Sequence, residues 1–275
     1  MTDHKVVAPD HPSYPEGLGD LETPPTIFVM GETSTAPAVA VVGTRRCTRY
    51  GSTLAHAFGQ ALAGAGWTTV SGLARGIDAA APRGTLSGGG EAVAVLGSGI
   101  DVVYPSENAD LYREIVAGRG AIMSEYPPGT PPDRWRFPAR NRLIAAIASA
   151  VVVVEAGETG GALITARLAA EMGRTVFAVP GDVDRPASMG CNRLIRDGAH
   201  PVLGVDDLIE ELSLVLGAPV PRRGVGADLP PAGLGIDQLP EFWGCTPAEA
   251  MARLARMEIT GEARRSGDVV VPGSR

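Results

Sequence analysis

The protein is a chain of 275 residues with 44% hydrophobic and 20% charged residues, 36 glycines, 23 prolines and a formal net charge of -7 at pH 7. This composition is typical of a globular, loop-rich protein and excludes a largely disordered one, and a chain of this length buries roughly 70% of its unfolded surface. The net negative charge argues against a protein that attracts nucleic acid over its whole surface.

Neither export nor a membrane span is indicated. The N-terminal segment MTDHKVVAPDHPSYPEG has no apolar core like that of a secretory signal, and the sequence contains no apolar run of about 18 residues. Cys47, Cys191 and Cys245 are far apart and form no CxxC pair for zinc or redox chemistry. We therefore predict a cytoplasmic protein without metal or cofactor.

The central part of the sequence alternates short β-branched runs with amphipathic segments. The expected strands are 38–43, 68–72, 92–97, 121–125, 150–156 and 175–181. The expected helices are 52–66, 76–86, 107–118, 139–149 and 161–173. This alternation predicts an α/β fold, a doubly wound Rossmann-like and mostly parallel sheet with helices on both faces. Ligands of such sheets bind at the carboxyl ends of the strands.

Composition shifts along the chain predict its domain organisation. Proline-rich residues open the chain, and the proline- and glycine-rich stretch APVPRRGVGADLPPAGLG is typical of a linker. The segment after it reads as a helix followed by a hairpin around Ser266 and Gly267, the ending of a winged-helix domain. We expect an N-terminal arm lying on the main domain at 1–36, a Rossmann-like domain at 37–215, a linker at 216–235 and a short winged-helix-like unit at 236–275.

Positive charge is concentrated in two windows of this acidic protein. Residues 33–77 hold four arginines and no acid, and residues 134–154, which begin with RWRFPARNR, hold four more and again no acid. Both windows contain a loop that follows an expected strand. The two windows therefore predict one positive face at the carboxyl edge of the sheet.

The loop GTRRCTRYG, residues 43–51, follows the first expected strand and opens a helix. The hydroxyl of Thr44 and consecutive N–H groups at a helix start are suited to an anion, and Arg45 and Arg46 add charge beside them. The alternative is a turn with solvated arginines. The loop is not a Walker loop, and no GxGxxG motif follows an expected strand, so dinucleotide binding is not supported.

Two further glycine turns lie at the same expected edge. EAGETGGALITA places Gly160 and Gly161 at a helix start, where the first N–H groups have no intrahelical partner. SGLARGID contributes a third turn with Ser71 and Gly72. Taken alone, each pattern is equally compatible with plain turn geometry.

RWRFPARNR precedes an expected helix start at Ala139, so Arg140 and Asn141 would project from the first turn, where the helix dipole disfavours a cation. An anionic ligand would compensate the positive charge of Arg140, and Trp135 and Phe137 would offer a stacking surface for bases. In the alternative, the aromatics pack under the loop and the arginines pair with nearby carboxylates, namely Glu125, Asp133 or Glu155.

Catalytic chemistry finds little support in the sequence. None of the four histidines lies in a motif that pairs it with a serine or cysteine, and no metal-binding spacing occurs. The carboxylates at strand ends are better explained as helix caps or partners of the loop arginines than as acid–base groups; they are Asp78, Asp101, Glu125 and Glu155. We predict no catalytic residue.

Six loops taken in order resemble the DprA/Smf family of DNA-processing proteins, from about Tyr14 to His200. They are GTRRCTRYG, SGLARGID, GSGIDVVYPSEN, SEYPPGTPP with FPARNRLIAA, VVVVEAGETGGALITARLAAEMGRTVFAVPG and GCNRLIRDGA. The resemblance implies a Rossmann-like domain that binds single-stranded DNA without sequence preference. It also implies a homodimer that helps to load a RecA-type recombinase during natural transformation.

The resemblance also implies roles for individual residues. It places Gly43, Thr44 and Arg45 in a phosphate turn. A DNA-facing pocket would contain Phe137, Arg140, Asn141 and Arg142, and a second phosphate turn would contain Gly160, Gly161 and Thr165. With Arg46, Ser71 and Gly72 from the loops, these residues form the predicted nucleic-acid site. By contrast, Arg134, Trp135 and Arg136 match no strict part of the family pattern.

The sequence departs from the family at three points. We expect the helical domain that usually precedes the segment resembling YPEGLGDLETPPTIFVMGE to be absent, and Ala81-Pro82 stands where many members have Ala-His. The C-terminal part resembles the family's winged helix but is short. The alternative function is a nucleoside-monophosphate phosphoribohydrolase of the LOG type, on a related fold. Its motif has a Pro-Gly-Gly lead and a glutamate after the threonine, whereas Glu-Ala-Gly and the carboxylate-free residues 163–166 stand here, which disfavours the enzyme.

Overall fold

The computed structural model describes residues 4–32, 36–118, 120–217, 229, 233–243, 246–259 and 263–272. The chain divides into two compact units, Met1–Arg222 and Arg223–Arg275. Cys245 and most of the expected 216–235 linker lie outside the described residues. The proposed domain boundaries within the chain stay predictions.

The first unit contains a nine-stranded sheet in the order β1-β2-β6-β5-β4-β3-β7-β8-β9. The neighbours from β6 to β9 pair in parallel, whereas β2 is antiparallel to both β1 and β6. The doubly wound, mostly parallel sheet is confirmed, as are the six expected strands. Its strands are β1 Lys5–Val7, β2 Ile27–Gly31, β3 Ala38–Val42, β4 Thr68–Ser71, β5 Ala92–Val95, β6 Ala121–Ser124, β7 Ala150–Val153, β8 Thr175–Ala178 and β9 His200–Pro201.

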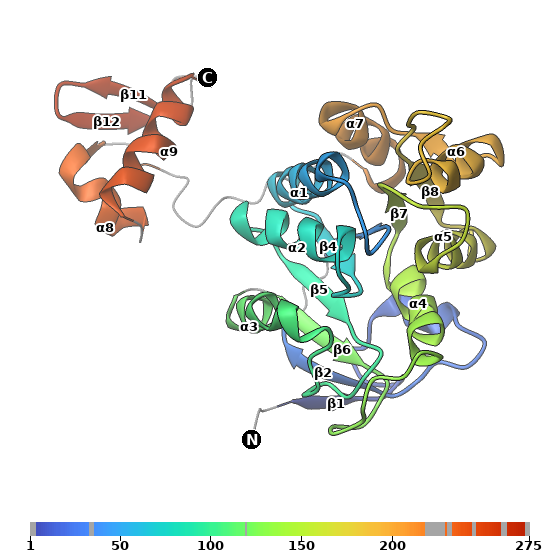
Figure 1. Cartoon of the computed structure of the whole chain (residues 1–275). Coiled ribbons are helices and arrows are strands. Elements are labelled where there is room, and N and C mark those ends of the chain that lie inside the picture. Colours follow the sequence, from blue (N-terminus) through green and yellow to red (C-terminus); the bar gives the residue numbers. More distant parts are fainter. Residues whose placement is uncertain are drawn as a thin grey trace. The chain divides into compact units, whose positions relative to one another are not determined.

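Helices cover both faces of this sheet (Figure 1). The five expected helices are present, but α4 begins at Arg136, three residues before the expected start at Ala139. This shift places Arg140 and Asn141 in the second turn of the helix and not in the first. The helices are α1 Arg49–Gly64, α2 Ile77–Ser87, α3 Ala109–Ala117, α4 Arg136–Ile147, α5 Gly161–Glu171, α6 Met189–Arg196 and α7 Val205–Leu216, with short 3-10 turns η1 Glu16–Asp20 and η2 Ser106–Asn108.

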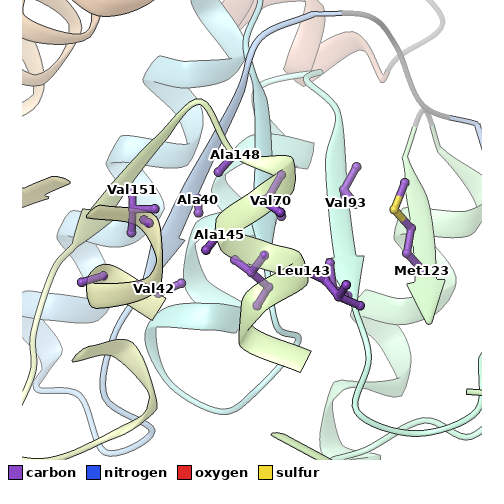
Figure 2. Close-up of a cluster of buried hydrophobic side chains, with 14 of the residues drawn as sticks. Ala40, Val42, Val70, Val93, Met123, Leu143, Ala145, Ala148 and Val151 are labelled. Atoms are coloured by element: carbon purple, nitrogen blue, oxygen red, sulfur yellow. The ribbon is translucent and has the colours of Figure 1, made fainter. Parts of the chain in front are cut away.

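Each central strand is buried on both faces, as the apolar runs predict. Along β3, Ala40 and Val42 belong to one core, whereas Val39 and Val41 belong to the core on the opposite face. Helix α4 lies against the first of these cores and crosses several strands with its apolar face (Figure 2). The helix that carries the arginine-rich stretch is therefore fixed over the middle of the sheet by packing.

Residues 5–31 form part of the sheet itself. Strand β2 pairs with β6, and β1 adds to β2 at the edge. Between them η1 buries Leu18 completely, in the same core as Leu143 and Ile144 of α4. The segment that sequence composition describes as an arm thus supplies two strands and part of the core beneath α4.

The second unit combines two helices with a three-stranded antiparallel sheet in the order β10-β12-β11. The expected helix and hairpin are present, and Gly267 occupies the turn with a φ of 68°. The winged-helix assignment stays a prediction. Its elements are β10 Leu234–Gly235, η3 Ile236–Gln238, α8 Leu239–Trp243, α9 Pro247–Ile259, β11 Ala263–Ser266 and β12 Val269–Pro272. In the ranges that the structure describes, no helix is both long and apolar enough to cross a membrane.

Candidate nucleic-acid interface

Strand order places a crevice at the carboxyl ends of β3 and β7. The chain proceeds from β3 to β4 on one side, while β7 pairs with β3 on the other, and ligands of doubly wound sheets bind at such a reversal. A groove of about 940 Å³ lies there. Its walls are the loop after β3, the loop after β7 with the start of α5, and the first turns of α4.

Glu155, just after β7, anchors the loop after β3. Its backbone oxygen accepts from the N–H of Thr44 at 2.7 Å, and its carboxylate accepts from the N–H of Thr48 at 2.8 Å and from the Thr48 hydroxyl at 2.5 Å. Thr48 in turn caps α1 by accepting from the N–H of Gly51 at 3.1 Å. Glu155 is 4% exposed. Its carboxylate therefore holds the loop after β3 in place and is not a free group facing the groove.

Asp78, in the first turn of α2, holds two neighbouring loops together. Its carboxylate accepts from the N–H of Gly72 at 3.1 Å and from the N–H of Gly43 at 3.4 Å. Burial raises the pKa of Asp78, and the charge of Arg140 is the largest effect in the opposite direction. The N–H groups of Gly43 and Thr44 thus have protein acceptors. Their acceptors are a carboxylate oxygen of Asp78 and the backbone oxygen of Glu155. The phosphate turn at Gly43, Thr44 and Arg45 stays a prediction.

Arg140 and Asn141 form part of the groove wall, with most of their polar atoms engaged. Arg140 is 3% exposed and donates to the backbone oxygens of Gly72, at 2.8 Å, and Val95. Asn141 donates to the backbone oxygen of Gly161 at 3.1 Å and accepts from Arg140 Nε at 3.3 Å. Burial lowers the pKa of Arg140 to about 10, so it remains charged at neutral pH.

The expectation that Arg140 and Asn141 project from the first turn of a helix is wrong. Because α4 begins at Arg136, both residues lie in its second turn, where their side chains are buried against the ends of β4 and β5 and the start of α5. Their contacts tie three strand-end loops to one helix. We infer that they position the walls of the groove.

Four more predicted residues are buried, paired within the protein or without a side chain. Ser71 is fully buried and donates to the backbone oxygen of Asp78 at 2.8 Å, and Thr165, 1% exposed, donates to that of Gly161 at 3.2 Å. Arg142 lies outside the groove lining and pairs with Glu125. Gly72 leaves room for its neighbours, because a Cβ there would lie 2.5 Å from Arg140 Nη2. These four residues therefore stabilise the loops around the groove.

The groups of the groove that face solvent are mainly arginines, aromatic rings and glycines, together with Glu158 and Thr159 of the loop after β7. The guanidinium of Arg45 lies 5.1 Å from the centroid of the Phe137 ring, and the Tyr104 ring lies 5.3 Å from Phe137 on the same groove wall. Arg45, Arg46 and Arg134 are exposed, and none has an ion pair in the described part of the chain.

Sequence reasoning placed Arg134 in a positive window but named neither Arg134 nor Tyr104 among the DNA-binding residues, although both line the groove. A signal for Arg134 was present, because it opens the arginine-rich window 134–154 that contains no acid. Nothing local marks Tyr104, which reaches the groove from the loop after β5. The glycines of the second turn, Gly160 and Gly161, are exposed at the start of α5, as expected.

The sequence pattern of the family described as DNA recombination-mediator protein A matches residues 5–213. The chain belongs to this family. Protein Smf of Synechocystis is 42% identical over 218 residues, which cover 77% of this chain and 54% of that protein. Protein Smf of Escherichia coli is 39% identical over 216 residues, 78% of this chain and 58% of that protein. The resemblance to the DprA/Smf family is confirmed.

Solved structures of family members share the fold. The X-ray structure of DNA processing protein A from Streptococcus pneumoniae aligns with a TM-score of 0.71 and 39% identity, over 77% of this chain and 74% of that one. The protein from Helicobacter pylori, described for its single-stranded DNA binding mode, aligns with a TM-score of 0.69 and 28% identity over 77% and 96% of the two chains. This chain spans little more than half the length of the two Smf proteins.

Proposed function

We propose that this chain binds single-stranded DNA without sequence preference in the groove at the ends of β3 and β7. The observation that carries the proposal is Arg45, an exposed arginine without an ion pair in the described residues, whose guanidinium lies 5.1 Å over the Phe137 ring. A cation for a phosphate beside an aromatic ring for a base is the usual combination for single strands. The H. pylori relative, described for this kind of binding, supports the proposal.

The charge distribution around the groove supports the same ligand. Arg45 and Arg134 line it, and Arg46 lies exposed beside Arg45, although the whole chain carries a net charge of -7. The glycine turn at Gly160 and Gly161 adds the N-terminus of α5, where a helix favours an anion. The site would therefore bind the phosphate backbone locally, while the rest of the surface repels it.

Lack of sequence preference follows from how the polar side chains are used. Sequence is read by hydrogen bonds to base edges, whereas contacts to phosphates carry no sequence information. Asn141, Thr165 and Ser71 are hydrogen-bonded within the protein. The ligand meets mainly arginines and ring faces, with Glu158 and Thr159 at the loop after β7, and every base has a face that can stack.

The test is the binding of fluorescently labelled oligo-dT and of a duplex of equal length, measured by anisotropy at several salt concentrations. We expect preference for the single strand. Three exposed arginines that each neutralise one phosphate give a log–log salt slope of about -2, so affinity falls about 16-fold between 50 and 200 mM salt. Equal or tighter duplex binding, or binding that does not respond to salt, would overturn the proposal.

We propose a binding role rather than an enzymatic one. Asp78, which lines the groove, and the neighbouring Glu155 are buried and hydrogen-bonded to backbone N–H groups of the adjacent loops. Glu158 is an exposed carboxylate of the lining, but no histidine, cysteine or serine lines the groove beside it among the described residues. A general acid or base needs to reach the substrate directly or through one water. Release of free base from AMP-like substrates by the purified protein would contradict this proposal.

The cellular role is proposed from the family. We propose that the chain acts in the cytoplasm as a homodimer and assists a RecA-type recombinase in recombination or natural transformation. The family description, recombination mediator, supports this role. Sedimentation measures the oligomeric state, and the rate of recombinase filament assembly on single-stranded DNA with and without this protein measures the assistance.

A further inference from the structure

Trp135 is a large aromatic side chain that the fold leaves in solvent. It is 58% exposed, whereas Trp67 in the core is 2% exposed. It stands immediately before α4, outside the motifs that carry the family resemblance. Large aromatic surface that is exposed and yet held in place marks binding sites on soluble proteins.

Three contacts hold the indole of Trp135. Its Nε1–H donates to the carboxylate of Asp133 at 2.9 Å, and the Tyr126 ring meets it edge-on at 6.3 Å. The Arg136 guanidinium lies 5.0 Å from its centroid and 5.1 Å from that of Tyr126, and also donates to the backbone oxygen of Pro131. The ring is thus ordered before any ligand arrives, which lowers the entropy cost of binding.

The charges around the indole favour a base with its phosphates. Arg136 lies over the ring, and the exposed Arg134 is the preceding residue. Among the described residues, the acid in contact is Asp133, which accepts from the in-plane N–H and so lies at the edge of the ring, not over its face. A cation beside an ordered aromatic face matches the elements that track single strands.

The position of Trp135 makes it continuous with the groove. Arg134 and Phe137 line the groove, but Trp135 between them does not. Arg134 and Trp135 are the last two residues before α4 and Phe137 is its second residue, so the three lie within four consecutive residues, whose neighbouring Cα atoms are about 3.8 Å apart. A strand that leaves the groove past Arg134 would therefore reach the indole within the next nucleotide or so.

We propose that Trp135 is a second base-stacking site, which binds the base of a nucleotide just outside the groove. The inference rests on the proposed function, because it extends the same DNA path. It concerns a subsite that belongs to this chain's own sequence, and it implies that oligonucleotides too short to extend beyond the groove do not contact Trp135.

The experiment uses the full chain and reads tryptophan fluorescence and the anisotropy of labelled oligo-dT in parallel. In the unaltered protein, the indole emission should be quenched with the same midpoint as the anisotropy. Trp135→Ala should remove that quench and weaken binding by roughly 5- to 150-fold, the range for loss of one stacked base. Trp135→Phe retains a ring and should recover most of the affinity. Thermal unfolding should be unchanged in both variants, since the side chain is exposed.

The outcomes separate the two proposals. Oligo-dT binding without quenching, and with equal affinity in Trp135→Ala, overturns the stacking site and leaves the proposed function standing. Absence of oligo-dT binding in the unaltered protein overturns both. A loss in Trp135→Ala that persists on an abasic oligonucleotide of the same length also overturns the stacking site, because no base is then present to stack.

Discussion

Replacing Arg140 with methionine tests whether this residue contacts DNA directly or positions the walls of the groove. The shorter, uncharged side chain of the Arg140→Met variant would fill similar space but donate no hydrogen bond. In the folded protein Arg140 donates to the backbone oxygens of Gly72 and Val95 and faces the buried carboxylate of Asp78. The substitution therefore removes the donor of two carbonyls and the nearest cation of one buried acid.

The expected cost follows from these partners. A buried acceptor that loses its donor costs about 1–3 kcal/mol, and removing one member of a buried charged set costs about 3–5 kcal/mol in total. Burial of the Arg140 charge is itself unfavourable and lowers the pKa of Arg140 to about 10. Methionine carries no charge to bury, which offsets part of this loss. We expect a net loss of about 3 kcal/mol, equivalent to roughly 6–12 °C in Tm for a domain of this size.

Thermal unfolding and oligo-dT binding are then measured for Arg140→Met, Arg140→Lys and Arg45→Met. Arg140→Lys keeps the charge and should lie between the first variant and the unaltered protein. Arg45→Met, at an exposed position, should leave Tm unchanged and weaken binding. If Arg140→Met kept the Tm but lost DNA binding, Arg140 would be a direct DNA contact, and its assignment as a positioning residue would be refuted.

Two further predictions concern the core. Gly84→Ala should cost about 1–3 kcal/mol in denaturant unfolding, because its Cβ would lie 1.9 Å from the backbone oxygen of His56 between α1 and α2. The control Gly64→Ala, with nothing within 4 Å, should be neutral or gain up to about 1 kcal/mol; equal losses would contradict the close approach. Burial raises the pKa of Cys191 from 9.0 to about 12, so the folded protein keeps a proton that the unfolded chain loses. The free energy of unfolding should then fall by about 1 kcal/mol between about pH 9 and 10, and Cys191→Ala should lack that fall.

Much of the fold was predictable because its signals are local. The β-branched runs and helical periodicity identify the six central strands and five helices, and glycine turns mark the loops between them. The strands β1 and β2 were not predicted. Strand β2, Ile27–Gly31, follows a proline pair, and its partner β6, Ala121–Ser124, is far away in the sequence, so nothing in the surrounding residues indicates the pairing.

The site was predictable as a set of loops but not in its division of roles. Arg140 and Arg134 stand in the same arginine-rich stretch, yet one is 3% exposed and the other faces solvent. What distinguishes them is the helix start at Arg136 and the proximity of Asp78 and Gly72, which come from another part of the chain. Burial of a charge depends on such tertiary partners, which a single sequence does not display.

The most direct measurement is the salt slope of oligo-dT binding in a double variant of the two exposed groove arginines. The unaltered protein should show a log–log slope of about -2, and Arg45→Met with Arg134→Met should reduce it to about -0.7. Arg113→Met, at an exposed arginine of α3 outside the groove, is the matched control and should keep the original slope. A double variant that binds with the unaltered slope would contradict the assignment of this groove as the DNA site.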